Sequence, residues 1–201
     1  IGQLKYKPKV FISASAIGYY GDRKNEKLFE YSSVGKGFLA EVCQEWEKET
    51  KIALERGIRV VNTRFGVILS NSGGALATML PAFKAGVCGV LGDGKQYMSW
   101  ITLEDAIRAI IYSIENEDIK GSINIVTPNP VTNFDYTKIL GKVIKKPTIF
   151  PVPKFMIKLL FGEMGEELLL ASNRVIPQKL LDNGFVFKHE NLEEALKNIL
   201  D

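Results

Sequence analysis

Two apolar stretches in the first part of the chain are rich in β-branched residues. They are KVFISA (residues 9–14) and IRVVNTRFGVIL (residues 58–69), and each predicts a buried strand of a parallel sheet. From Lys36 to about Arg56 the apolar positions recur at helical spacing, and Gly57 follows as the helix stop. Strand, helix and strand in this order predict a βαβ crossover. The residues expected on the buried face of the helix are Leu39, Val42, Cys43, Trp46 and Ala53, and those expected to point away are Glu41, Glu45, Glu47 and Lys48.

The rest of the chain first adds helices and a strand to this α/β unit, and its composition then changes. SNSGGA (70–75) predicts a loop that opens an apolar helix, TLED (102–105) resembles a capping box before a further helix, and SINIV (122–126) predicts a short strand. A second capping pattern begins at Thr132, and short helices dominate from there on. The change in composition places a boundary near residues 127–132. We therefore expect an α/β domain over residues 1–128 and a small, mostly helical domain over residues 129–201.

Composition narrows the classes of function without naming one. Apolar residues make up 46% and charged residues 24% of the chain, and the net charge of +3 is too weak a bias to indicate nucleic acid or membrane partners. No apolar run approaches the length of a membrane span. The two cysteines, Cys43 and Cys88, favour a reducing compartment, and the protein is expected to be cytoplasmic. With His189 as the single histidine, we expect neither a metal site nor a Ser-His-Asp triad.

Hydroxylated and small residues follow the two predicted strands. FISASAIGYYG (11–21) covers the end of the first strand, and FGVILSNSGG (65–74) covers the end of the second. In an open parallel sheet, ligands bind beyond the carboxyl ends of the strands, so both segments are expected at one ligand-facing edge. Small residues there let the backbone approach a flat ring, and hydroxyls polarise a carbonyl or an alcohol. The pattern predicts a cofactor crevice.

Four segments in order carry a resemblance to a known family: SASAIGYYGD (13–22), RFGVIL (64–69), GDGKQYMSWITLED (92–105) and RVIPQKLLDNGFVF (174–187). Together they resemble the epimerase-like branch of the extended short-chain dehydrogenase/reductases, and more narrowly the branch commonly called YfcH-like. The resemblance implies the C-terminal part of a Rossmann-type, doubly wound parallel sheet that holds NADP or NAD. It also implies a small helical C-terminal domain that closes over a small-molecule substrate.

The resemblance also implies roles for individual residues. Ser15 matches the family's catalytic serine, with Ser13 as the alternative in a shifted register. Tyr19 and Tyr20 are candidate acids, and the alternative for each is a packed tyrosine whose hydroxyl is satisfied. The candidates for the cofactor are Ser13, Ala14, Phe65, Gly66 and Val67, and those for the substrate are Lys84, Met98 and Trp100. A surface role for Lys84 and a core role for Trp100 stay open.

The sequence departs from the family pattern in three places. The glycine-rich GxxGxxG turn of the first Rossmann strand does not occur, and we expect the chain to be a fragment whose relatives carry that motif upstream of Ile1. The Tyr-x-x-x-Lys pair is also missing, since neither residue type occurs around Phe38 or Val42. Finally, Met98 stands where relatives that act on nucleotide sugars carry an arginine, which makes that substrate class doubtful.

Two classes of function therefore compete. The first is an NADP(H)-linked oxidoreductase or epimerase-like enzyme with an unknown small-molecule substrate. The second is a non-catalytic protein, which either binds a nucleotide without turnover or acts as an interaction module. A single crossover cannot cover both faces of its sheet, so self-association through the uncovered sheet is expected of the chain alone.

Overall fold

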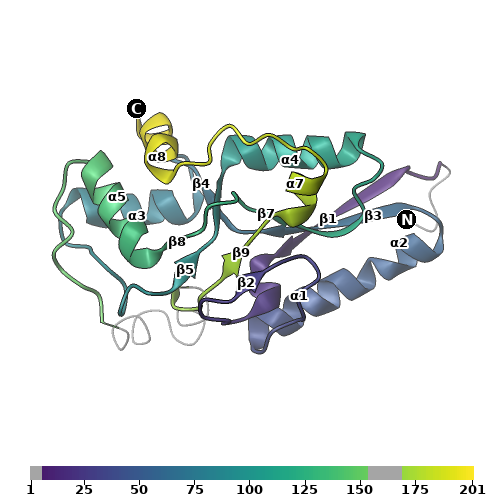
Figure 1. Ribbon diagram of the computed structural model, residues 1–201, viewed down its shortest axis with the longest axis horizontal. Coiled ribbons are helices and arrows are strands. Elements are labelled where there is room, and N and C mark those ends of the chain that lie inside the picture. The colour runs from purple at the N-terminus through teal and green to yellow at the C-terminus, as the bar shows by residue number, and fades with distance from the viewer. Residues whose placement is uncertain (1–5, 154–168) are drawn as a thin grey trace.

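The computed structural model describes residues 6–153 and 169–201 of the chain. Its centre is a parallel sheet with the strand order β1-β3-β7, formed by β1 (Val10–Ala16), β3 (Arg59–Phe65) and β7 (Gly121–Ile125) (Figure 1). Ala16 of β1 pairs with Phe65 of β3, which in turn pairs with Ile125 of β7. The three carboxyl ends therefore meet at one edge. The predicted parallel α/β architecture is confirmed.

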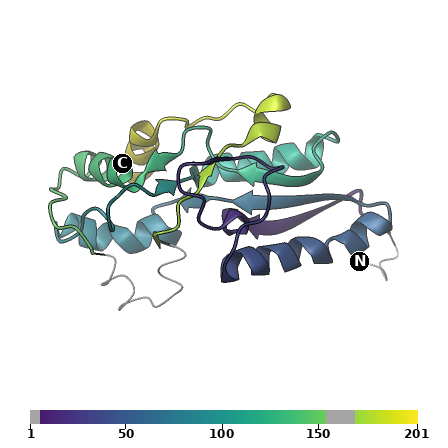
Figure 2. The ribbon, with the colours of Figure 1, turned by 60° about the horizontal axis from the view of Figure 1, so that its bottom comes forward.

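Helices cover both faces of this sheet, so the expectation of an uncovered sheet face is wrong, because α4 packs on the face opposite to the crossover helices. One face carries α1 (Phe38–Glu49) and α2 (Lys51–Glu55), and the opposite face carries α4 (Leu103–Glu115) (Figures 1 and 2). The single helix expected from Lys36 to Arg56 is thus two helices that meet at Thr50, whose hydroxyl donates to the Glu47 carbonyl oxygen at 2.6 Å. A side chain that bonds a backbone carbonyl in this way competes with the regular helical pattern.

Short strands and further helices surround the carboxyl edge. The short strands pair as β2 (Lys27–Leu28) with β9 (Arg174–Val175), β4 (Val67–Leu69) with β6 (Trp100–Thr102), and β5 (Tyr97–Met98) with β8 (Val131–Thr132). The remaining helices are η1 (Ile17–Tyr20), α3 (Gly74–Lys84), α5 (Asn133–Val143), α7 (Gln178–Asp182) and α8 (Leu192–Leu200). Both capping predictions are confirmed, because Thr102 and Thr132 each accept a hydrogen bond from the backbone N–H three residues later. Of the short helices expected after Thr132, any within residues 154–168 lie outside the described residues.

The core under α4 joins segments that are distant in sequence. Val61 and Ile123 of the sheet pack with Ala109 of α4 and with Leu180 and Phe185 near the end of the chain. The β5–β8 pair also connects residues on either side of the expected boundary at residue 128. The two expected parts therefore pack on one another through apolar contacts and a strand pair.

The long second strand is interrupted at Gly66, which separates β3 from β4. A Cβ atom at this position would lie 2.5 Å from the Ser99 carbonyl oxygen and 2.6 Å from the Val126 side chain. Such distances are sterically forbidden, so only glycine allows the chain to turn here against β6 and the end of β7. Packing alone is enough to require this residue.

Two side chains of α1 lie opposite to where helical periodicity places them. Trp46 was expected to be buried and is 53% exposed, whereas Glu47 was expected to point into solvent and is largely buried against the sheet. The reason is chemical. The sheet face below α1 carries Ser15, Arg64 and Ser122, and their donors select a carboxylate at this position.

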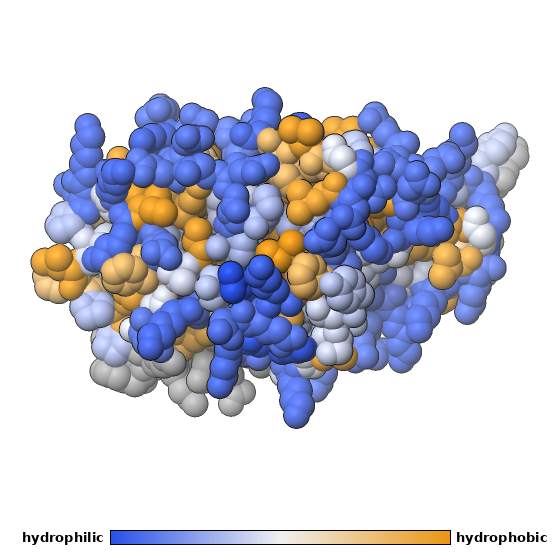
Figure 3. Space-filling model, viewed as in Figure 1, coloured by the Kyte–Doolittle hydropathy of each residue, from blue (hydrophilic) through white to orange (hydrophobic). Residues whose placement is uncertain are grey.

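The edge formed by β1 is open among the described residues, since β1 pairs with β3 alone. Beside it, Phe11, Trp46 and Ile52 line a groove of 390 Å³ against α1 and α2. On the opposite face, Leu103, Ile107 and Ile111 form an exposed apolar stripe along α4, where hydrophobic residues interrupt the polar surface (Figure 3). Within residues 6–153 and 169–201, no helix has the length and apolar character needed to cross a membrane.

Candidate functional site

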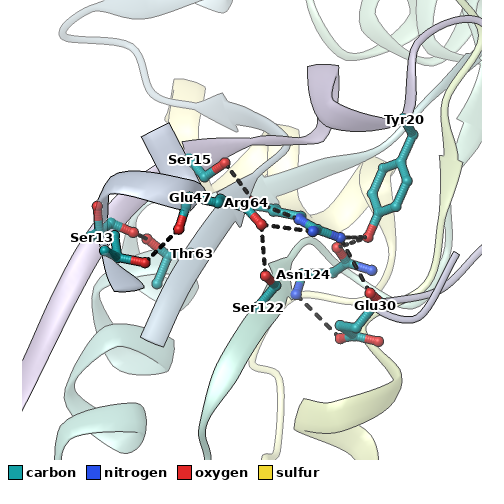
Figure 4. A network of polar contacts seen from close by, with 10 residues as sticks. Ser13, Ser15, Tyr20, Glu30, Glu47, Thr63, Arg64, Ser122 and Asn124 are labelled. Atoms are coloured by element: carbon teal, nitrogen blue, oxygen red, sulfur yellow. Dashed lines mark hydrogen bonds and ion pairs between the residues drawn. The ribbon is translucent and has the colours of Figure 1, made fainter. Parts of the chain in front are cut away.

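A buried ion pair forms the centre of the candidate site, beneath the carboxyl edge of the sheet (Figure 4). Arg64 of β3 binds Glu47 of α1 through two parallel bonds, with Nε 2.7 Å from Oε1 and Nη2 2.8 Å from Oε2. Only 4% of the Arg64 side chain and 11% of the Glu47 side chain are exposed. Burial alone would raise the pKa of Glu47, but the hydrogen bonds and charge of Arg64 outweigh it and hold that pKa below its usual range. Glu47 is therefore ionised at neutral pH.

Ser15 lies at the end of β1 and is 5% exposed. Its hydroxyl donates to Glu47 Oε1 at 2.9 Å, and Ser122 of β7 donates to Glu47 Oε2 at 2.8 Å. Because the Ser15 proton is directed to a carboxylate, the free lone pairs of Oγ can accept a hydrogen bond from a ligand. The arrangement thus fixes Ser15 as an acceptor.

The two tyrosines of η1 contact the same guanidinium in different ways. The Arg64 guanidinium carbon lies 3.5 Å from the ring centroid of Tyr19, a cation–π contact. The Tyr20 hydroxyl accepts from Arg64 Nη1 at 2.9 Å and donates to Asn124 Oδ1 at 2.7 Å. Tyr20 is fully buried, and burial raises its pKa to about 12 although Arg64 opposes this shift. For Tyr20 the packed alternative, with a satisfied hydroxyl, agrees with these contacts.

The network continues from Asn124 to Glu30, in the loop after β2. Glu30 Oε1 accepts the backbone N–H groups of Asn124 and Lys179, each at 3.2 Å. The main-chain carbonyl of Glu30 accepts from Arg64 Nη1 at 3.3 Å. Burial raises the pKa of the Glu30 carboxyl, against the effect of these bonds. Glu30 thereby fastens the loop to β7 and to α7.

The residues expected to contact the cofactor separate into two groups. Phe65, Gly66 and Val67 lie at the carboxyl edge, where Gly66 N–H donates to the Ile125 carbonyl and Val67 N–H to the Ser99 carbonyl. Ser13 and Ala14, by contrast, line the groove beside α1 and α2. The five residues therefore do not form one cluster.

The residues expected to contact the substrate lie on three different elements. Lys84 is exposed at the end of α3, and Met98 of β5 accepts a weak hydrogen bond from Asn133 at 3.5 Å. Trp100 is fully buried, and its indole N–H donates to the Asn129 carbonyl at 3.1 Å. The core role left open for Trp100 is thus the one its surroundings support.

Periodicity alone missed the central residues of the network. Glu47 was expected to point into solvent like the other glutamates of the helix, and neither Arg64 nor Asn124 was singled out. A signal was present nonetheless: polar residues recur at every second position in VVNTRF (Asn62, Arg64) and in SINIV (Ser122, Asn124). In strands covered by helices, that period marks one polar buried face, which needs charged partners from the covering helix.

The carboxyl edge carries small and apolar side chains, and the arginine next to it is already paired. Ala16, Phe65 and Ile125 end the paired strands there with small or apolar side chains, and Ser15 lies one residue behind them. Arg64, the cation of β3 that lies next to this edge, already binds Glu47, Tyr19 and Tyr20. Among the described residues, no three His, Cys, Asp or Glu side chains gather as a metal site would require.

Comparison with known proteins agrees with this geometry. A family model described as "NAD dependent epimerase/dehydratase family" matches residues 3–126, and one described as "Domain of unknown function (DUF1731)" matches residues 152–199. The epimerase family protein Mb2239 of Mycobacterium bovis is 44% identical over 185 residues, which cover 92% of this chain and 62% of that protein. The chain thus spans less than two thirds of that relative.

Solved structures show the same relationship. The human epimerase family protein SDR39U1 (isoform 2), crystallised with NADPH, matches 99% of this chain and 68% of its own chain, with a TM-score of 0.89 and 26% identity. A nucleoside-diphosphate sugar epimerase from Corynebacterium glutamicum matches 96% of this chain and 37% of its own, with a TM-score of 0.80 and 38% identity. The resemblance expected from the four sequence segments is confirmed, and the chain belongs to the NAD dependent epimerase/dehydratase family.

Proposed function

We propose that this chain forms the nicotinamide-facing and substrate-facing part of an NADP(H)-linked oxidoreductase or epimerase-like enzyme that acts on a small molecule. The observation that carries the proposal is the Ser15 hydroxyl at the end of β1, held by an ionised Glu47 at 2.9 Å. The human relative crystallised with NADPH supports this choice of cofactor. The free thiols of Cys43 and Cys88 support a cytoplasmic location.

Each residue has a distinct part in this proposal. The cofactor, when bound, supplies or accepts a hydride, and Phe65 and Val67 provide the backbone edge beside its ring. Ser15 accepts a hydrogen bond from a hydroxyl or an amide of the ligand, because its own proton is committed to Glu47. Tyr19, on η1, contacts the Arg64 guanidinium and is the candidate proton donor. Tyr20, on the same element, positions Arg64 and Asn124.

Turnover tests the proposal. NADPH and NADP⁺ are supplied with a panel of carbonyl compounds and alcohols, and absorbance at the nicotinamide band is followed for the wild-type chain extended upstream of Ile1 and for its Ser15→Ala and Ser33→Ala variants, of which Ser33 is an exposed loop residue. We expect Ser15→Ala to lose at least about tenfold in kcat, since general acid–base and polar contributions of this kind are worth more than that. Ser33→Ala is expected to match wild type. Equal turnover in all three would contradict the role of Ser15.

A second candidate function, a protein that binds a nucleotide without turnover, is favoured by the residue types found on α1. The positions where related reductases carry their tyrosine and lysine are occupied by Phe38 or Leu39 and by Val42 or Cys43. Burial raises the pKa of the Cys43 thiol and keeps it neutral, and a thiol carries no positive charge in either protonation state, so it cannot replace the lysine. Nucleotide binding without turnover on the whole panel would favour this non-catalytic reading.

Self-association belongs to the proposal for the chain alone. The open edge of β1 lies between the groove at Trp46 and Ile52 and the apolar stripe of α4. A second copy that pairs with this edge would cover both the groove and the apolar stripe. Light scattering after gel filtration should give a dimer for wild type and a monomer for Trp46→Glu. A monomeric wild type at 100 μM, about the concentration at which weak interfaces form, would exclude it.

A further inference from the structure

The short helix η1, which carries Tyr19, follows directly on β1 and is too short to hold its own shape firmly. It has four residues, and hydrogen bonds of the 3-10 type are less well aligned than those of an α-helix. Its C-terminal bond runs from the Gly21 N–H to the Gly18 carbonyl at 3.0 Å. The position of the Tyr19 ring therefore depends on groups outside η1 that bind its main-chain carbonyls.

Asn173, the residue before β9, supplies two of these outside bonds. Its carboxamide lies against the carbonyl oxygens of Ile17 and Gly21, so the nitrogen of the carboxamide faces them. In this orientation Nδ2 donates to the Gly21 oxygen at 3.1 Å and to the Ile17 oxygen at 3.3 Å. Ile17 is the first residue of η1, and Gly21 directly follows the last one. One side chain thus holds both ends of the element.

A nearby loop holds the middle of η1. The Gly35 N–H donates to the Tyr19 carbonyl at 2.9 Å. A Cβ atom at Gly35 would lie 2.0 Å from the Tyr20 carbonyl oxygen, so the backbone of the loop approaches η1 as closely as only glycine permits. The helix is therefore fixed between this loop and Asn173, which belongs to the second part of the chain.

Asn173 is itself held by the strand on its other side. The residue is only 9% exposed. Its N–H donates to the Tyr97 carbonyl of β5 at 3.1 Å, and its carbonyl accepts from the Ser99 hydroxyl at 2.7 Å. In Figure 1, β9 accordingly runs between β5 and β2. Asn173 thus joins η1 to β5, the strand that contains Met98.

We propose that Asn173 is a positioning residue for the candidate proton donor Tyr19, an inference that rests on the proposed function. Its carboxamide fixes both ends of η1, so the Tyr19 ring stays against the Arg64 guanidinium, whose carbon lies 3.5 Å from the ring centroid. Its main chain is bound to β5, so the same residue links Tyr19 to the substrate candidate Met98. A displacement of about 1 Å in such a group can cost about a hundredfold in rate.

Turnover by the chain extended upstream of Ile1 is the first part of the test. Asn173→Ala removes both donors, and we expect kcat to fall at least about tenfold while the KM for NADPH changes less than about twofold. The matched control is Asn183→Ala at the end of α7, which removes a carboxamide that donates to the Lys179 carbonyl at 2.8 Å. The control should match wild type in both constants. A kcat of Asn173→Ala equal to that of the control would overturn the inference.

Hydrogen exchange in the same extended chain tests the contact without turnover. In Asn173→Ala the Gly35 N–H should exchange at least about tenfold faster, whereas the N–H of Val61 in the sheet core should keep its wild-type rate. In wild type itself, the side-chain N–H protons of Asn173 should be protected relative to those of the exposed Asn25, a comparison that needs no variant to fold.

The outcomes separate this inference from the proposed function. Unprotected side-chain protons of Asn173, or an unchanged exchange rate at Gly35 in Asn173→Ala, would overturn the inference. Protected Asn173 protons in a wild type that turns over no substrate would instead contradict the proposed function and leave the contact between Asn173 and η1 confirmed.

Discussion

Substitution of Glu47 by glutamine tests whether the buried ion pair organises the site. The carboxylate accepts four hydrogen bonds, two from Arg64 and one each from Ser15 and Ser122. Glu47→Gln keeps the shape of the side chain but leaves the Arg64 charge buried without its counter-ion. Breaking a buried pair in this way costs about 3–5 kcal/mol, because the remaining charge is not compensated.

The size of the effect can be measured by thermal and urea unfolding. An unfolding entropy of about 2.1 cal/mol/K per residue gives about 0.4 kcal/mol/K for 201 residues, so the Tm should fall by about 7–12 °C. Glu45→Gln is the matched control, since Glu45 lies on the same helix and forms an exposed pair with Lys48 at 3.1 Å. This exposed pair should contribute less than about 1 kcal/mol.

A double variant separates the loss of the pair from the unpaired charge. Glu47→Leu combined with Arg64→Met removes both charges, and we expect it to be more stable than Glu47→Gln alone. The reasoning would be refuted if Glu47→Gln and Glu45→Gln lowered the free energy of unfolding by the same small amount. In that case the Glu47–Arg64 pair would not be an organising contact.

Three further predictions concern other buried groups. Tyr136→Phe should raise the free energy of unfolding in urea by about 1 kcal/mol, because the buried Tyr136 hydroxyl has no partner among the described residues. Gly66→Ala should lower it by about 1–3 kcal/mol through the contact with Ser99, whereas Gly73→Ala, with nothing within 4 Å, should be close to neutral. Burial raises the pKa of the Glu30 carboxyl, so the folded state binds a proton more readily than the unfolded state. The free energy of unfolding of wild type should therefore rise relative to that of Glu30→Gln as the pH falls from about 7.5 to about 5. A constant difference between the two free energies across that range would contradict the sign of the pKa shift.

The sequence predicted the architecture well because it rests on long periodic patterns. The two β-branched stretches, the helix between them and both threonine caps depend on local composition, and the structure contains all of them. The break of the helix at Thr50 and of the second strand at Gly66 was not predicted. The break at Gly66 depends on a distant segment, Ser99, which no local pattern reports, whereas the break at Thr50 accompanies the hydrogen bond from its hydroxyl to the Glu47 carbonyl.

The sequence predicted the residues at the end of the first strand but missed the buried Glu47 and Arg64 beneath them. Ser15, Tyr19 and Tyr20 follow a predicted strand, so their position near an edge could be inferred. That Tyr20 is buried against Asn124, a residue more than one hundred positions away, depends on the pairing of β3 with β7. Glu47 was placed on the wrong face because an average over helical positions cannot detect a buried arginine on the strand below.

We propose that the carboxyl edge around Ser15 is part of a nicotinamide cofactor site. Calorimetric titration of NADPH into the 201-residue chain and into a form extended upstream of Ile1 tests it most directly. We predict binding by the extended form and none by the shorter chain, because Arg64, the cation of β3 next to the carboxyl edge, is already engaged with Glu47 and Tyr20. Absence of binding by both forms would contradict the account.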